Sequence, residues 1–179
     1  MKRKKGGFGT KTVTMTAIFT ALGVVFLFIG SVFEFLDLTA AMAASLIIVF
    51  AVIEGGGAVP WMIYAGTSAI ALLILPNKFP AVVYLLFAGL YPIVKSWSER
   101  YSSLLSILIK LLFTNVTLTL IILIAKYLLA MPDDELGLRW AVYLVCNVMV
   151  VIFDYLLTQL ITVYQRKLRR IFRSDNVFR

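Results

Sequence analysis

The sequence predicts an all-α integral membrane protein, a single domain over residues 1–179 with six transmembrane helices in a compact bundle and both termini in the cytoplasm. The chain of 179 residues is 61% hydrophobic and 15% charged, whereas a soluble domain is only about half apolar. Apolar runs of roughly 20 residues recur, and each is long enough to cross a ~30 Å hydrocarbon core as a helix. Polar and apolar residues do not alternate with a period of two, which argues against a membrane barrel.

Short connections join the predicted spans, so consecutive helices are expected to be antiparallel neighbours. The first apolar run exceeds the ~7–15 residues of a signal-peptide core, and we expect it to be retained as a helix. Pro92 predicts a kink in the fourth span, and the length of the fifth predicts a tilt or an extension beyond the bilayer. A basic tail occupies residues 165–179. The six spans cover about 12–33, 38–54, 57–76, 80–96, 103–130 and 139–164.

Lysine and arginine gather at both ends of the chain and between the fourth and fifth spans. With six spans these segments share one side of the membrane, and the positive-inside rule makes that side the cytoplasm. The net charge of +8 is therefore expected to form a cytoplasmic rim facing the lipid bilayer, not a nucleic-acid site. The basic residues are Lys2, Arg3, Lys4, Lys5, Lys11, Lys95, Arg100, Arg166, Lys167, Arg169, Arg170 and Arg173.

Residue types that carry common catalytic chemistry are missing. The chain has no histidine and a single cysteine, Cys146, which excludes histidine-based triads, HExxH zinc sites and an intrachain disulfide. Neither a P-loop nor a GxSxG elbow occurs. The acidic stretch at 133–135 is expected to be solvated surface. We therefore expect a protein that is not an enzyme and that uses no cofactor and no metal.

A stripe of polar side chains runs along the sixth span. Tyr143, Asn147, Asp154, Thr158 and Gln165 fall within one sector of a helix at ~100° per residue. Polar groups in a span are functional candidates because burying them in lipid costs free energy. The stripe is expected to face a cavity or other helices, and polar packing alone explains it about equally well.

An outward-facing pocket is the binding hypothesis. Polar residues in the outer halves of several spans supply its candidates, to which the rigid two-proline turn LPNKFP adds a cation at the mouth. A plain connection between helices is the alternative for that turn. The candidate substrate-binding residues are Asn77, Lys78, Tyr84, Asn115, Thr119, Tyr143 and Asn147, and Thr67 and Ser68 lie at a similar depth.

Charged residues in the inner half form a second group. Lys110 and Asp154 are intramembrane charges, and pairing them would offset part of the free energy of burying both. Lys110 could equally extend its ammonium to the inner surface. Glu54 and Lys95 lie near the cytoplasmic ends of their spans.

Two alanines in "MTAIFTALGVV" mark a close-packing face on the first helix. Ala17 and Ala21 are four residues apart, so they lie on one face and let another helix approach closely. That helix belongs either to another protein or to the second span, whose segment "TAAMAAS" at 39–45 is also rich in small residues.

A basic start followed by "TMTAIFTALGVV" in a small six-helix protein resembles the substrate-binding S components of energy-coupling factor (ECF) transporters. Their first helix carries an AxxxA motif after a Lys/Thr-rich start, matched here by Ala17 and Ala21 behind "TKTVT". No residue pattern of one particular vitamin is present.

The resemblance implies a bacterial-type cytoplasmic membrane protein that captures a vitamin or similar micronutrient from outside. It also implies that Ala17 and Ala21 dock on a transmembrane T component, to which two cytosolic ATPases supply the energy. The alternative is a non-transporting membrane scaffold, such as a rod-shape-determining membrane protein, since those are thought to share a related architecture.

Overall fold

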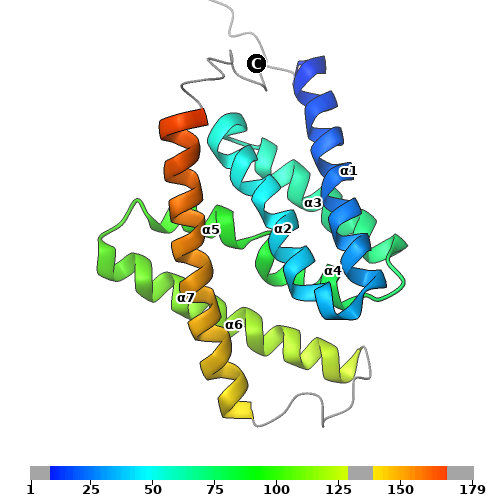
Figure 1. Ribbon diagram of the computed structural model, residues 1–179, viewed down its shortest axis with the longest axis vertical. Helices are drawn as coiled ribbons and strands as arrows, with labels where there is room; N and C mark the ends of the chain where they lie inside the picture. Colours follow the sequence, from blue (N-terminus) through cyan, green and yellow to red (C-terminus); the bar gives the residue numbers. More distant parts are fainter. Residues whose placement is uncertain (1–8, 129–138, 169–179) are drawn as a thin grey trace, which may run out of the picture.

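A computed structural model describes residues 9–128 and 139–168, and all regular secondary structure in these two ranges is helical (Figure 1). The basic N-terminal residues, the acidic loop and most of the basic tail lie outside the described residues. The elements in chain order are α1 (Thr10–Val32), η1 (Glu34–Leu36), α2 (Asp37–Phe50), η2 (Ala51–Gly55), α3 (Val59–Ile74), α4 (Phe79–Val83), η3 (Tyr84–Ala88), α5 (Tyr91–Ser98), α6 (Ser103–Tyr127), α7 (Arg139–Val163) and η5 (Tyr164–Leu168).

Each predicted span corresponds to a helical segment, so the all-helical fold class is confirmed. Within the described part of the chain, five segments are long and apolar enough to cross a membrane: Thr10–Val32, Asp37–Gly55, Phe79–Ser98, Leu104–Tyr127 and Ala141–Arg166. The third predicted span is shorter, because α3 has 16 residues and a rise of ~1.5 Å per residue makes it ~24 Å long. The count of six crossings and the cytoplasmic side of the termini stay predictions.

The fourth predicted span is a broken helix. It begins as α4, continues as the π-helical turn η3 and resumes as α5 after Gly89 and Leu90. Pro92 lies in the first turn of α5, where its missing N–H removes no intrahelical hydrogen bond. Pro92 predicts a kink at this place. In the structure one helix ends and a new helix, α5, begins with its own direction.

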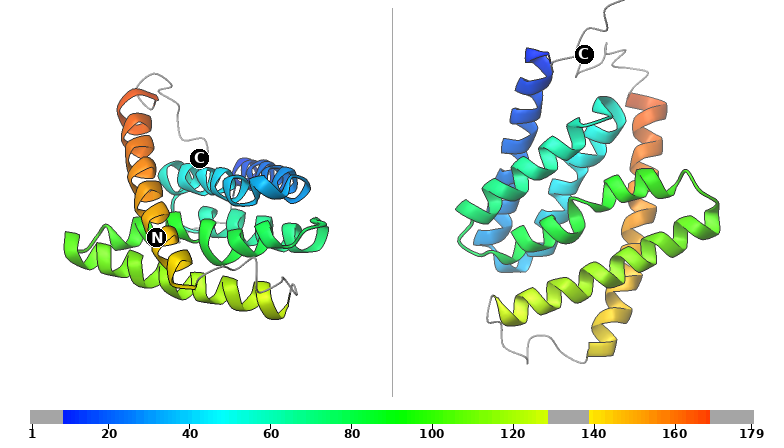
Figure 2. Two further views of the ribbon diagram at one scale, coloured as in Figure 1. Left: turned by 60° about the horizontal axis from the view of Figure 1, so that its bottom comes forward. Right: turned by 180° about the vertical axis from the view of Figure 1, so that it is seen from behind.

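The helices are arranged in layers around the broken fourth segment. Figure 2 shows α4 and α5 between the α1–α2 pair and α6, while α7 crosses α6. The start of α1 and the end of α7 lie at the same end of the molecule in both figures. Alanines make much of the central contact, with Ala41, Ala44 and Ala81 fully buried beside Ile48 and Tyr84.

Helices α1 and α3 pack through two reciprocal threonine–glycine contacts. A Cβ on Gly66 would lie 3.0 Å from the Thr20 side chain, and a Cβ on Gly23 would lie 3.0 Å from the Thr67 side chain. The Thr67 hydroxyl also donates a hydrogen bond to the Thr20 carbonyl at 3.4 Å. Small residues thus let the two backbones approach closely, as at other helix pairs in membranes.

The second span packs against α1 through Gly30, not through the AxxxA pair. A Cβ on Gly30 would meet the Cβ of Ala40, which belongs to the "TAAMAAS" segment. Ala17 and Ala21 lie on the exposed side of α1. Internal packing, the alternative for these two alanines, is therefore not what the fold uses.

We predict that Gly66→Val destabilises the protein by about 1–3 kcal/mol, because the added atoms overpack the contact with Thr20. Ala65→Val is the matched control, since Ala65 is the preceding position on α3 and is exposed. The free energy of unfolding in detergent micelles measures both effects. Equal losses for the two variants would contradict the close α1–α3 contact.

Candidate functional site

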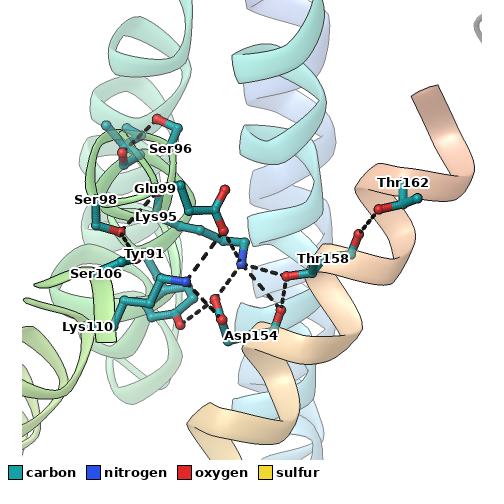
Figure 3. A network of polar contacts seen from close by, with 11 residues as sticks. Tyr91, Lys95, Ser96, Ser98, Glu99, Ser106, Lys110, Asp154, Thr158 and Thr162 are labelled. Carbon is teal, nitrogen blue, oxygen red and sulfur yellow. Dashed lines mark hydrogen bonds and ion pairs between the residues drawn. The ribbon is translucent and has the colours of Figure 1, made fainter. Parts of the chain in front are cut away.

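The polar stripe of α7 meets α5 and α6 at Asp154. Figure 3 shows this carboxylate between the side chains of the other two helices. Its Oδ1 accepts hydrogen bonds from the Tyr91 hydroxyl at 2.9 Å and the Lys95 ammonium at 2.6 Å. Its Oδ2 accepts one from the Lys110 ammonium at 2.9 Å. Asp154 therefore joins three helices through one side chain.

Lys95 is the buried cation of this network. Its side chain is only 2% exposed, and its ammonium has three close acceptors on two helices. These are Asp154 Oδ1, the Glu99 Oε1 at 2.8 Å and the Thr158 hydroxyl oxygen at 2.8 Å. Because an ammonium has three N–H donors, each of them has a partner. The network thus satisfies a charge that would otherwise be costly to bury.

Lys110 and Glu99 complete the network toward the exposed side. The Lys110 ammonium lies 3.5 Å from the same Glu99 Oε1 that Lys95 contacts. Two ammonium groups then face two carboxylates, and the formal charge of the four groups sums to zero. Lys110 therefore pairs with Asp154, as one of the two hypotheses for Lys110 proposes. Its long side chain also brings the ammonium near Glu99.

Aromatic side chains wall the network on its inner side. The Tyr91 ring lies against Phe87 and Phe153, with centroids 5.2 and 5.7 Å away, and Phe113 stacks on Phe87. Low-polarity surroundings strengthen hydrogen bonds and ion pairs, and they raise the free-energy cost of leaving one unpaired. Losing any one partner of this network is therefore expected to be more damaging than losing a surface ion pair.

Two further polar pairs continue along the α6–α7 contact. Asn115 and Asn147 exchange amide hydrogen bonds of 3.2 and 3.1 Å, and the Thr119 and Tyr143 hydroxyls lie 2.8 Å apart. Positions rise along α6 as they fall along α7, so the pairs form an antiparallel ladder. Four of the predicted substrate-binding residues therefore come together, but they satisfy one another across a helix–helix contact.

Polar groups of the LPNKFP turn form hydrogen bonds to the neighbouring helices. The Asn77 backbone exchanges hydrogen bonds with the Ser31 hydroxyl, and the Asn77 amide donates to Asp37 at 3.3 Å. The Lys78 ammonium donates to the Leu75 carbonyl at 2.6 Å, at the end of α3. The turn thus ties α3 and α4 to α1 and α2. The described contacts do not bring Asn77 and Lys78 to the α6–α7 pairs.

Tyr84 lies in the core of the bundle. Its side chain is 1% exposed and its ring packs near that of Tyr64, with centroids 6.2 Å apart. Thr67 and Ser68 are also buried, and the Ser68 hydroxyl has no hydrogen-bond partner among the described residues. The seven predicted pocket residues thus occupy three places: the turn, the core and the α6–α7 contact. A substrate role for them stays a prediction.

Tyr91 and Glu99 are the network residues that the sequence-based search did not select. A signal for them exists, because Tyr91, Lys95 and Glu99 follow one another at intervals of four and share one helix face. The sequence predicts Lys95 near the cytoplasmic end of its span, whereas in the structure α5 begins after a break and Lys95 points into the bundle. The sequence indicates the pair of Lys110 with Asp154 but not the contact of Lys95 with the same carboxylate.

The described residues contain no group of three or more His, Cys, Asp or Glu side chains placed to hold a metal ion. Comparison of the whole chain with protein-family models, curated proteins and solved structures yields no match. The chemistry of the site therefore rests on its geometry, which is that of a neutral, fully paired ion network.

We predict that Asp154→Leu and Lys95→Met each destabilise the protein by about 3–5 kcal/mol, because each leaves a buried charge without its main partner. The double variant should lose less than the sum of the two, since Lys110 and Glu99 then balance each other. A double-mutant cycle on the free energy of unfolding measures this coupling. Gln159→Leu is the control on the exposed side of α7, and additive losses would argue against the ion pair.

For the Asn115–Asn147 pair we expect a coupling of about 0.5–2 kcal/mol, the range of hydrogen bonds between membrane helices. The cycle compares Asn115→Leu, Asn147→Leu and the double variant, again through the free energy of unfolding. A coupling near zero would show that the two amides do not hold α6 against α7.

Proposed function

We propose that this protein is a membrane-embedded substrate-binding subunit of the ECF S-component type, which docks on a T component through α1. The observation that carries the proposal is the exposure of Ala17 and Ala21 on α1, whose buried residues lie on another face of the helix. The buried face of α1 is supplied by other residues, chiefly Thr16, Thr20 and Gly23. The alanine face therefore remains available for a partner.

Small side chains are a poor choice for a face that meets only lipid. They offer less dispersion contact than leucine, but they let a second helix come close. Beside the pair, α1 exposes larger residues such as Ile18, Leu22 and Val25, so the alanines form a low strip next to an apolar ridge. A coupling helix of a T component would fit against such a strip, and its two cytosolic ATPases would act through that contact.

The proposed membrane is a bacterial-type cytoplasmic membrane with both termini inside. The long apolar helices support a multi-pass protein, and the common end reached by the start of α1 and the end of α7 suits termini on one side. The proposed cargo is a vitamin or similar micronutrient taken from outside. Asn115, Thr119, Tyr143 and Asn147 would contact it only by giving up part of their present pairing.

That pairing favours the second candidate function, a non-transporting membrane scaffold of the rod-shape-determining type. A scaffold needs no internal site, and the α6–α7 polar pairs then serve only to fix the two helices. The two functions share the outward face of α1 and differ in whether a small molecule is bound.

The docking proposal predicts that Ala17→Trp and Ala21→Trp reduce recovery of the T component and ATPases at least about fivefold, because an indole prevents close helix approach. The partners are co-expressed with the full chain and captured from detergent extracts. Ile29→Trp is the control, since Ile29 is exposed at the other end of α1. Equal recovery for all variants would refute docking through this face.

Mass spectrometry of the purified wild-type protein separates the two functions in the same preparation. A stoichiometric small molecule released on denaturation supports a substrate-binding subunit. A wild-type protein that holds no small molecule and captures no ATPases contradicts the transport role, and capture of other membrane partners by that protein then favours the scaffold.

A further inference from the structure

Glu99 is the exchangeable member of the ion network. Its side chain is 46% exposed, compared with 2% for Lys95 and 13% for Lys110. It lies at the C-cap of α5, just outside the helix. Asp154, by contrast, is held in place by α7 and by three donors. Glu99 can therefore swing away without movement of a helix, whereas Asp154 cannot.

If the Glu99 side chain moves out of the network, another anion is needed at its position to balance the two lysines. The ammonium groups of Lys95 and Lys110 would then share the single carboxylate of Asp154, leaving one net positive charge beside an aromatic wall. Both ammoniums already contact one oxygen, Glu99 Oε1, at 2.8 and 3.5 Å. That oxygen marks a position where one anionic oxygen is bound by two cations, and the occupant at present is the chain's own side chain.

The position lies next to a segment with the character of a membrane interface. Trp97 and Tyr101 are exposed and their rings pack edge to face, with centroids 5.1 Å apart. Arg100 between them is also exposed. Exposed tryptophan, tyrosine and arginine are typical of the level of the lipid headgroups. At that level of a bilayer, the anion outside the chain that Lys95 and Lys110 would meet is a headgroup phosphate.

We propose that Lys95 and Lys110 form a binding site for a phosphate group, that of an anionic phospholipid headgroup or of a soluble phosphate, and that Glu99 occupies this site when the phosphate is absent. A phosphate oxygen takes the position of Glu99 Oε1 and restores the charge balance. Lysine ammoniums bind phosphate as point charges, and basic sites between membrane helices bind anionic headgroups. The inference does not rest on the transport proposal.

The test uses the full chain purified in neutral detergent and measures the midpoint of thermal unfolding. One titration adds phosphatidylglycerol against phosphatidylcholine at equal total lipid, and a second adds inorganic phosphate against chloride at equal ionic strength. We expect a saturable rise of the midpoint with one of the two phosphates. The lipid arm and the soluble arm distinguish the source of the group.

Three variants test whether the rise of the unfolding midpoint arises from binding at the ion network. Glu99→Gln keeps the shape of the side chain but removes the competing charge, so half-saturation should need about fivefold less phosphate or anionic lipid, the lower end of typical couplings. Lys110→Met should abolish the response. Arg100→Gln removes an exposed cation from the same connection and should respond as the wild type does.

Two results would overturn the proposal. An absence of saturable stabilisation in both the wild type and Glu99→Gln would show that the lysines bind only their internal partners. A loss in Arg100→Gln as large as that in Lys110→Met would show general attraction to a basic surface. The unfolding midpoint of Glu99→Gln with phosphate or lipid is compared with the midpoint of the same variant without it. The first of these two results can therefore be obtained even if Lys110→Met does not fold.

Discussion

The carboxylate of Asp154, bound by two lysines and a tyrosine, is the interaction on which the C-terminal half of this protein depends. It is the point where α5, α6 and α7 meet, and each helix supplies a group that would be unstable in lipid by itself. A buried ion pair adds little net stability compared with apolar packing, but removing one partner is severe. Such a network therefore acts chiefly on specificity: it fixes which face of α7 turns inward.

The helices of the two halves of the chain pack through different kinds of contact. In the N-terminal half, α1, α2 and α3 approach closely because glycines meet threonine and alanine side chains. In the C-terminal half, α6 and α7 cross through polar pairs and leave wide apolar faces outward. Lipid competes with apolar packing between helices but not with hydrogen bonds, so both solutions suit a membrane.

Much of the fold could be predicted from residue patterns, and part of the site could as well. Four members of the predicted α7 stripe, Tyr143, Asn147, Asp154 and Thr158, contact α5 or α6, whereas Gln165 is exposed. Lys110 pairs with Asp154, as one of the two hypotheses for Lys110 proposes. Lys95 was harder, since its direction depends on the restart of α5 at Tyr91 and Pro92. Tyr84 is buried beside Tyr64 of α3, and its expected convergence with Asn115 and Asn147 stays a prediction.

Residue patterns along the chain are enough to predict the elements: helices of membrane length, the polar face of α7 and the small-residue positions of α1. These follow from local periodicity and from the free-energy cost of polar groups in lipid. Which residues contact one another follows from the folded arrangement of the helices. That arrangement assigned Thr20 and Gly23, not Ala17 and Ala21, to the internal contact, and it placed two lysines on one carboxylate. Rotation and crossing of helices depend on contacts between distant segments, which no local pattern contains.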